Sequence, residues 1–522
     1  MAWSSAFRER LAVGGEPMFA LDFTDAPNPE MFDFRPERYI LHTHGISGGP
    51  NIAHALLSVS APTQSVQIRS WSPSIGAVRA TLSGAHHASW IARFIPRGML
   101  CRMKVGFAGM DYGEWGDCGI FQYKGISGAR NGWVMEFGDF FGYMQSRSDT
   151  LDYRDLFEDA GKTTFTVAPN WTVGDPTLSV DSVAGFEFDP GQRGLLHCQP
   201  TTGDPFYLKY TAVVGGSNRF SVVDADVMGT TRVNLGVSTN AATITSLGYT
   251  FADIPTTWEK LLFKAVSAGT LPDGWNLQLY KDFTTVDTDD WDQQRGRLHP
   301  IVGAFNIDFV TAQPLTNPWT AISEYMAAFG SWLVVRQGRL SFRAAQNVAA
   351  DSVNPIYLDG TITDVDIVSV EGQTLYHPEA RDDVIQFNTT GAAYSDGGTA
   401  PRSLPATQVF RHPSIGKVFD DDVATTNENL AGIHIRDRLM PWYTRLPNQL
   451  RLNLAGWRWS ELVPGDVVTV DSDHVIDLQT PITSAVKRTL SGTPFLVTAI
   501  SPDFANFTTS VELAALPPSG RT

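Results

Sequence analysis

The sequence predicts a mainly β fold with a few short helices, divided into several domains, and three observations support this prediction. The chain has 522 residues, which is too long for one hydrophobic core and fits roughly three to five domains. Its 46 glycines and 31 prolines suit many short strands joined by tight turns. The recurring local pattern is the short, partly alternating strand, and stretches with helical periodicity are few.

The first region, residues 1–162, has the pattern of a β-barrel or β-sandwich. Residues 39–43, 65–69 and 77–82 are short, partly alternating runs with glycine or proline between them, as half-buried antiparallel strands require. We expect an N-terminal β-barrel here, completed by residues from about 254–300.

Residues 163–253 have the pattern of a separate insertion. Residues 206–214 alternate, Gly215 and Gly216 can supply a turn with positive φ, and residues 219–223 return along the first strand. The rest of the segment is rich in small and hydroxylated residues. We therefore expect a small all-β module inserted into the first barrel.

A helix followed by a hairpin marks a middle α+β domain, residues 301–426. Asn317 can cap the helix, proline follows in the first turn, and Gly330 can end it. The apolar stripe has the i, i+3, i+4, i+7 spacing: Ile322, Tyr325, Met326 and Phe329. Two short runs around a Gln-Gly turn then predict a hairpin over residues 332–343.

The last region, residues 427–522, is predicted to form a second, C-terminal β-barrel. It begins with an expected helix at residues 427–439, and another short helix is expected at residues 258–268. A polar loop covers residues 471–488. Four runs read as strands: residues 449–453, 462–470, 495–499 and 508–513. No internal repeat of the solenoid type is visible.

Charge and cysteine content exclude several classes of protein. With 39 basic and 55 acidic residues, the formal net charge is −16, which disfavours nonspecific binding of nucleic acid but is compatible with DNA that only passes through. Three cysteines, Cys101, Cys118 and Cys198, make no disulfide framework and no metal-binding pattern. We expect buried free thiols. The sequence also predicts no secretory signal and no membrane-spanning segment.

One string matches the nucleophile elbow of serine hydrolases. Residues 45–49 read Gly-Ile-Ser-Gly-Gly, which would make Ser47 a nucleophile. The elbow needs a helix after the serine and a parallel sheet around it, whereas residues 50–54 do not favour a helix. A related string at residues 125–128 is expected in another loop, as turn chemistry would give. We interpret both strings as turns.

Histidines and acidic runs are the candidates for metal binding. His42 and His44 lie two apart on one face of a strand, with His54 and the pair at residues 86–87 elsewhere, but no third ligand is identifiable.

Acidic residues gather at residues 287–292 and 420–422, which could bind Ca²⁺ or supply paired carboxylates for glycan hydrolysis. Solvated loops are the simpler interpretation of both runs. We therefore predict no catalytic residue, no metal site and no cofactor, and not an enzyme.

Three segments in a fixed order resemble the tail-hub (baseplate-hub, or tip-attachment) proteins of long-tailed bacteriophages and related tail-like particles. They are the helix and hairpin at residues 322–342, the strand at residues 382–388, and Leu-Val-Pro-Gly-Asp-Val-Val-Thr-Val at residues 462–470 with the strands that follow it. The resemblance covers roughly residues 255–515.

This resemblance implies a structural role. In that family the hub is a homotrimer, and each chain contributes two similar β-barrels, so that six barrels match the six-fold tail tube. The expected partners are tail-tube and other distal tail proteins, the tape-measure protein, other tail-tip or receptor-binding proteins, and DNA only in transit. The expected location is the tail tip of a virion, after synthesis in the host cytoplasm. Because the chain ends soon after residues 508–513, we expect another protein to recognise the host.

Two alternatives remain open at this point. The chain could be a carbohydrate- or receptor-binding tail protein, if tryptophans are exposed and stack on sugars: Trp71, Trp90, Trp115 and Trp133. It could also be a tail-associated glycan hydrolase that uses the acidic loop at residues 287–292.

Overall fold

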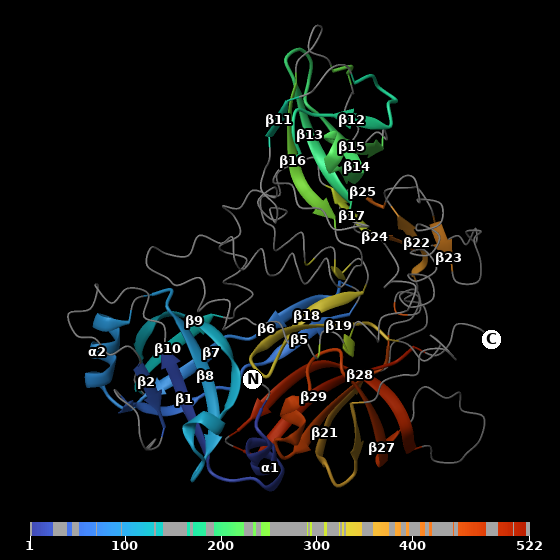
Figure 1. The fold of residues 1–522 in the computed structure, drawn as a ribbon. Helices are drawn as coiled ribbons and strands as arrows, with labels where there is room; N and C mark the ends of the chain where they lie inside the picture. The colour runs from blue at the N-terminus through green and yellow to red at the C-terminus, as the bar shows by residue number, and fades with distance from the viewer. Residues whose placement is uncertain are drawn as a thin grey trace, which may run out of the picture.

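The structure is a computed structural model of the 522-residue chain (Figure 1). It describes residues 3–23, 39–43, 52–68, 70–95, 97–129, 132–138, 164–166, 171–183, 193–223, 233–235, 242–250, 290, 293–294, 307–310, 323, 326–327, 330–346, 359–374, 382–387, 393–395, 408–412, 417–419, 442, 447–476, 489–504 and 506–517.

An eight-stranded sheet of the N-terminal region is drawn in blue at the left of Figure 1. Its strand order is β3-β2-β1-β8-β9-β10-β7-β4, and its pairs are antiparallel except for the parallel pair β2–β3. The bounds are β1 Pro17–Phe23, β2 Tyr39–His42, β3 Ile52–His54, β4 Leu56–Val59, β7 Val78–Leu82, β8 Leu100–Phe107, β9 Gly116–Ala129 and β10 Gly132–Gly138. Helix α1 (Ser5–Val13) precedes the sheet, and helix α2 (Ala85–Phe94) joins β7 to β8.

A second large sheet lies beside the first and is drawn mainly in orange and red. Its main order is β20-β27-β28-β29-β26-β21, and the hairpin β5–β6 of the N-terminal region adds to it through β28. A short helix, η8, joins β26 to β27. The bounds are β5 Gln64–Gln67, β6 Ser72–Ile75, β20 Gly360–Thr363, β21 Ile367–Thr374, β26 Gln449–Ala455, η8 Arg458–Glu461, β27 Val467–Ile476, β28 Thr489–Asp503 and β29 Thr508–Ala515.

The inserted segment forms a six-stranded antiparallel sheet, green at the top of Figure 1. Its order is β11-β16-β13-β14-β15-β12, and its core contains Trp171, Phe206 and Tyr210. The bounds are β11 Thr164–Thr166, β12 Thr177–Ser179, β13 Arg193–Pro200, β14 Phe206–Val214, η4 Gly215–Ser217, β15 Arg219–Val223 and β16 Ala242–Thr250. The hairpin predicted from the glycine turn is β14–β15.

The predicted hairpin of the middle region is found where it was expected, and the described residues of the predicted helix are helical. Ser323, Met326 and Ala327 are helical, and Gly330 has a φ of 64°. The hairpin consists of β18 and β19, and its turn has positive φ at both central residues. Small sheets complete the region, with bounds β17 Ile307–Val310, β18 Ser331–Arg336, β19 Arg339–Ala344, β22 Asp382–Phe387, β23 Ala393–Ser395, β24 Gln408–His412 and β25 Lys417–Phe419. The helices expected at residues 258–268 and 427–439 lie outside the described residues.

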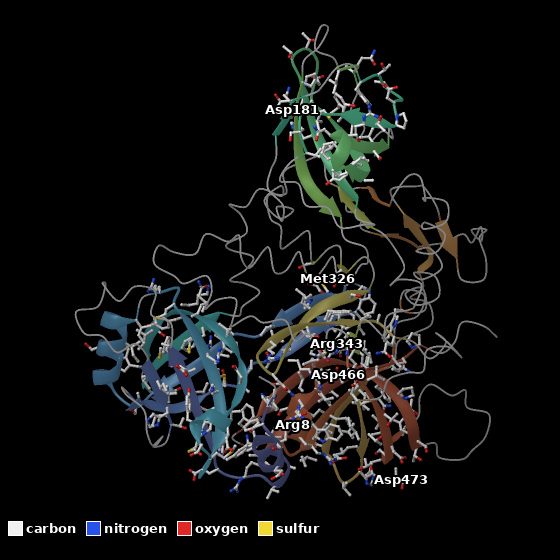
Figure 2. All side chains as sticks on the ribbon, in the orientation of Figure 1. Arg8, Asp181, Met326, Arg343, Asp466 and Asp473 are labelled. Atoms are coloured by element: carbon white, nitrogen blue, oxygen red, sulfur yellow. The ribbon has the colours of Figure 1, made fainter. Side chains whose placement is uncertain are left out.

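Residues of β27 show that the second sheet is covered on both faces where this strand begins. Val467 packs outward against Trp332 of β18 and Trp71 of the β5–β6 region, and Val468 and Val470 point into the sheet's own core. A run of four valine or threonine residues without alternation is typical of a strand covered on both sides. Side chains therefore fill the junction between the hairpins and the second sheet, where Figure 2 labels Arg343 and Asp466.

The predicted fold class, mainly β with a few short helices, is confirmed, but the two large sheets are not barrels closed by strand pairing within the described residues. The edge strands of each sheet are instead consecutive in the chain. Ala55 alone separates β3 from β4, and residues 364–366 separate β20 from β21. Each sheet is therefore rolled up until its two edges meet at a bend of the chain. The predicted domain boundaries remain a prediction.

No helix within the described residues is long and apolar enough to span a membrane.

Candidate assembly site

The two large sheets follow the same path, although their sequences differ. In each, a bent strand supplies both edges of the sheet, and a later strand pairs with the second half of this bent strand. A helical connector follows, and then three antiparallel strands complete the sheet. We call β3, β4, β7, α2, β8, β9 and β10 the N-terminal unit, and β20, β21, β26, η8, β27, β28 and β29 the C-terminal unit. The N-terminal unit differs by the hairpin β1–β2, which lies between β8 and β3.

Next to the bend, the bent strand has the same register in both units. Its second half pairs with β7 or β26 through a skipped residue, which is Leu57 in β4 and Val368 in β21, and β21 skips a second residue, Glu371, further on. Both skipped side chains are exposed, at 62% and 58%. A bulge at the same position of two strands is a matched backbone feature, because it bends and twists each strand at the same point.

The bend itself is tied down by the same hydrogen bond in each unit. Ser83 N donates to Ala55 O over 2.7 Å, and Ala455 N donates to Asp366 O over 2.7 Å. The acceptor is in each case the residue before the second half of the bent strand. These bonds hold the meeting point of the two sheet edges.

A glycine turn places the first strand of each three-stranded meander. Gly98 N donates to Tyr123 O, and Gly465 N donates to Val497 O, both over 2.8 Å. Tyr123 N and Val497 N return a bond of 2.8 Å to the residue after the glycine. Both glycines have positive φ, 94° and 110°, a region that favours glycine. The Pro-Gly-Asp turn of the sequence resemblance therefore has a counterpart in the N-terminal unit.

The match continues into the meander. Lys124 of β9 and Thr498 of β28 are the skipped residues of a second bulge, one residue after the bonds of the glycine turn. The four strands β7–β10 and β26–β29 are therefore equivalent residue by residue around this point.

A cross-strand ion pair occupies equivalent positions in the two units. Arg79 and Glu136 face each other, with 3.5 Å between Nη2 and Oε1, and Arg451 pairs in the same way with Glu512. All four side chains are largely exposed, so we expect little stability from the pairs. The two pairs show that the strands of both units are paired in the same register.

The hairpin β18–β19 lies between the two units and contacts both. On the N-terminal side, Trp3 N donates to Gln337 Oε1 over 3.1 Å, and Gly338 lies so close to Asp117 that a Cβ atom would come within 2.7 Å of its carboxyl carbon. Gly338 also has a φ of 78°. Only glycine fits this contact without strain.

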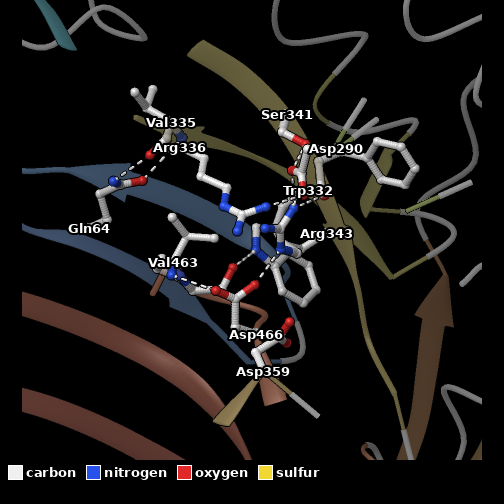
Figure 3. A network of polar contacts seen from close by, with 12 residues as sticks. Gln64, Asp290, Trp332, Val335, Arg336, Ser341, Arg343, Asp359, Val463 and Asp466 are labelled. Carbon is white, nitrogen blue, oxygen red and sulfur yellow. Dashed lines mark hydrogen bonds and ion pairs between the residues drawn. The ribbon is translucent and has the colours of Figure 1, made fainter. Parts of the chain in front are cut away.

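On the C-terminal side, Arg343 of β19 is fully buried between two carboxylates (Figure 3). Its Nε donates to Asp466 Oδ1 over 2.7 Å, and its Nη1 donates to Asp290 Oδ2 over 2.8 Å. Burial alone would lower the pKa of Arg343, but the carboxylates of Asp466 and Asp290 together raise it above the ordinary value. Because buried ions must be paired to be tolerated, the three side chains depend on one another.

Asp290 is held by further donors. Arg336 Nη1 donates to its Oδ1 over 2.6 Å, and Ser341 Oγ donates to its Oδ2. Burial alone would raise the pKa of Asp290, but Arg343, Ser341 and Arg336 together bring it below its usual value. Asp290 is therefore a buried anion in a network of alternating charges.

The Pro-Gly-Asp turn is fixed to the hairpin by the same network. Asp466 Oδ2 accepts from Val463 N over 2.9 Å, and Trp332 Nε1 donates to Pro464 O over 2.9 Å. Burial raises the pKa of Asp466, while Arg343 works in the opposite direction. The turn that carries the resemblance is thus a junction between two β-elements.

The hairpin β5–β6 belongs to the N-terminal region and contacts the same junction. Residue Ser65 faces Ala499, and Gln64 faces Ile500, in an antiparallel pairing with β28. The side-chain amide of Gln64 also bonds both backbone groups of Val335, at 2.7 and 3.1 Å. One region of the chain therefore donates strands to the sheet of another.

The structure describes some of the residues that were weighed as nucleophile or metal ligands. Ser47 and His44 lie outside the described residues. The string at residues 125–128, expected in a loop, lies in strand β9 instead, because the bulge at Lys124 lets glycines continue the strand. His42 is buried on β2. No group of three or more potential metal ligands occurs in the described part of the chain.

Two of the tryptophans that a carbohydrate-binding protein would expose are packed inside the molecule. Trp71 is buried and stacks on Trp332 with 5.2 Å between ring centroids, and Trp115 is also buried. Neither can stack on a sugar. Trp133 is 36% exposed.

Of the acidic run at residues 287–292, the structure describes Asp290, which belongs to the buried network. The run at residues 420–422 lies outside the described residues.

The three cysteines are free, as predicted, and their thiols have pKa values raised by burial: Cys101, Cys118 and Cys198.

Comparisons with known proteins give only remote similarity. No family model and no curated protein matches the chain. Among solved structures, the 43 kDa tail protein of prophage MuSo2 from Shewanella oneidensis aligns at 12% identity over 68% of this chain and 95% of that one, with a TM-score of 0.25. A chain of the virion of a native gene transfer agent particle aligns at 12% identity over 50% and 88%, with a TM-score of 0.19. Both TM-scores are too low to establish a shared fold.

Proposed function

We propose that this chain is a structural hub subunit at the tip of a phage-type tail, whose three copies form a ring that joins a six-fold tail tube to a three-fold tip. The observation that carries this proposal is the duplicated unit. Three chains with two equivalent units each present six similar units, which is what a trimer needs in order to meet a six-fold tube.

The order of the sequence segments supports the same role. The helix and hairpin, the strand β22 and the Pro-Gly-Asp turn follow one another as in the hub family. Arg343 connects the hairpin to the turn through Asp466. Because the network has little solvent exposure and fixed geometry, it suits a rigid scaffold better than a reactive site.

The proposed partners follow from this role. They are two further copies of the chain, tail-tube and other distal tail proteins, the tape-measure protein, and other tail-tip or receptor-binding proteins. The net charge of −16 suits a passage through which DNA moves without adhering, because like charges repel a polyanion. We propose no catalytic activity, and a location at the tail tip of a virion.

The test is the assembly state of the purified chain. We expect native mass spectrometry to give three times the chain mass, and electron micrographs of single particles to show rings with six similar lobes. A chain that stays monomeric at high concentration, and that also forms no ring with tail-tube protein, would contradict the proposal.

A further inference from the structure

The edge of β28 beyond its bulge is covered by a strand from elsewhere in the chain. Strand β27 pairs with β28 as far as Leu496, and after the bulge the hairpin β5–β6 takes its place opposite Ala499 and Ile500. As a result Ile500 is only 3% exposed, and the skipped residue Thr498 is buried. The C-terminal unit therefore has an acceptor edge, and this edge is occupied.

The N-terminal unit has the same edge at the equivalent place in β9. Strand β8 pairs with β9 as far as Gln122, and after the bulge residues 125–129 pair with β10 on one side only, as far as the described residues show. Here Lys124 and Ser127 are exposed, and Ile126, the equivalent of Ile500, is only partly buried. An unpaired strand edge is a template for another strand.

The strand that covers the edge of β28 comes from an insertion in the other, N-terminal unit. By the same rule, the strand that covers the edge of β9 would come from an insertion in the C-terminal unit. Hairpin β5–β6 is an insertion of the N-terminal unit, at residues 60–77, between its bent strand and β7. The insertion at the same point of the C-terminal unit is residues 375–448, between β21 and β26. Its described strands β22–β24 are drawn at the right of Figure 1, and the N-terminal unit is drawn at the left.

We propose, on the basis of the hub assembly above, that the β9 edge at residues 125–128 accepts one of the strands β22–β24, which lie in the insertion at residues 375–448, from a second copy of this chain. Each unit then donates its insertion to the next unit. Within one chain, the N-terminal unit donates to the C-terminal unit, and between two chains, the C-terminal unit of one donates to the N-terminal unit of the other. Such a contact is head-to-tail, so it generates a closed ring when the rotation closes.

Backbone pairing explains how the two contacts can be equivalent without similar sequences. A strand added to an edge gains its affinity from main-chain hydrogen bonds, and its side chains add specificity. Two glycines, Gly125 and Gly128, flank Ile126 and Ser127 in β9, and the side chains of Arg97 and Trp133 lie against them. Ile126 supplies apolar surface that the added strand would cover, as Ile500 is covered in the other unit.

The first test is amide hydrogen exchange of the full-length chain, measured for the monomer and for the isolated ring. We expect the amides of residues 125–128 to exchange at least tenfold more slowly in the ring. The amides of Ala499 and Ile500, which are paired within the chain, serve as the internal control and should be protected in both states. Equal exchange of residues 125–128 in both states contradicts the proposal.

The second test is a substitution at the edge. Ile126→Asp places a charge where assembly would bury it, so we expect the concentration for half-assembly to rise at least tenfold. Val365→Asp is the matched control, because Val365 is 86% exposed and lies in the turn between β20 and β21. It should assemble as the unmodified chain does. Thermal unfolding shows whether each variant is folded, and hydrogen exchange of the unmodified chain decides if Ile126→Asp is not.

The third test identifies the donor. Rings assembled from mixed light and isotopically heavy chains are treated with a zero-length carbodiimide, which joins lysines to carboxylates in contact. We expect links between Lys124 of one chain and acidic residues in 375–448 of another. Inter-chain links from Lys124 to a different segment contradict the assigned donor.

The outcomes separate this inference from the proposed function. A ring that forms while residues 125–128 stay unprotected removes the β9 contact and leaves the hub role standing. A chain that never assembles, alone or with tail-tube protein, removes both.

Discussion

The N-terminal and C-terminal units have the same backbone plan but different surroundings. Around the C-terminal unit, the hairpins β5–β6 and β18–β19 cover the outer face and the edge of β28, and Arg343 ties the glycine turn to the middle of the molecule. Around the N-terminal unit, within the described residues, the equivalent edge of β9 has no pairing on that side, and the turn at Gly98 is bonded by the amide of Gln122 and by no buried ion pair. A duplicated sheet can therefore keep its register while one copy takes up contacts within the chain and the other keeps a surface for contacts outside it.

The largest expected effect is at Arg343, which ties the glycine turn of the C-terminal unit to the hairpin β18–β19. Arg343→Ala leaves Asp290 and Asp466 buried without their shared cation, so we expect the free energy of unfolding to fall by about 3–5 kcal/mol. Denaturant unfolding measures it. Arg451→Ala, an exposed arginine of the same unit, is the control and should change it by less than about 1 kcal/mol. A similar small loss for both variants would mean that the network adds nothing to stability.

The equivalent glycines, Gly465 and Gly98, should respond differently to substitution by alanine. A Cβ at Gly465 would overlap the side chain of Arg343 and lie 2.7 Å from Trp332 Cζ2, whereas at Gly98 its nearest neighbour would be Gln122 Nε2 at 3.7 Å. Positive φ penalises both alanine variants by about 1 kcal/mol, and overpacking adds about 1–3 kcal/mol at Gly465 alone. We expect Gly465→Ala to lose about 2–4 kcal/mol and Gly98→Ala about 1 kcal/mol in denaturant unfolding. Equal losses would show that the junction relaxes to make room.

The acids on the two sides of hairpin β18–β19 should give opposite pH dependence. Burial, opposed by Arg102, raises the pKa of Asp117 to about 6. Because this folded-state pKa lies above the unfolded value, the contribution of Asp117 to stability is complete below about pH 4 and is lost as the pH rises through 6.

Asp117→Asn removes this dependence, so the stability of the unmodified chain should decline by about 2 kcal/mol relative to the variant between pH 4 and 7. The pKa of Asp290 is lowered, so its contribution is present above the ordinary aspartate pKa and is lost as the pH falls further. Unfolding curves at a series of pH values measure both, and a constant difference between variant and unmodified chain would contradict the prediction for Asp117.

The smallest effect is expected at the equivalent ion pairs. Arg79→Ala and Arg451→Ala should each lose less than about 1 kcal/mol, and raising the salt concentration should reduce both losses, because the pairs are exposed. Parallel unfolding curves at low and high salt give the comparison. A large loss in only one unit would show that the two pairs are not equivalent in energy.

The sequence was sufficient for elements whose signal is local. The hairpin β18–β19 could be predicted from two apolar runs around Gln337 and Gly338, and β14–β15 from Gly215 and Gly216, because turn residues with positive φ have few alternatives. The strand β22 was also expected at its observed place.

The duplication could not be predicted in this way. It is carried by backbone hydrogen bonds and bulges, which different side chains support equally well. When β7 is aligned with residues 450–454 of β26, the two strands share only the arginines Arg79 and Arg451 and the leucines Leu82 and Leu454, and the matching glutamates are more than fifty residues further on. The Arg–Glu pair at the same register is one signal of the duplication that the sequence does carry.

The role of Asp290 was equally hidden. The acidic run around Asp290 favoured a solvated loop. No residue close to it in the sequence indicates that its partners are Arg336 and Arg343, on β18 and β19. Burial of one member of an acidic run is decided by tertiary contacts that local composition does not encode. The outer carboxylates of such a run can be hydrated while this one is paired.

The bent strand of each unit has a mechanical consequence. A sheet whose edge strand is a free end can be peeled apart by breaking one row of hydrogen bonds at a time. Here a force that pulls the two edges apart acts on covalent backbone, at Ala55 in one unit and at residues 364–366 in the other. Each unit therefore behaves as a hoop under tension, which opens only when hydrogen bonds on both sides of the bent strand break together.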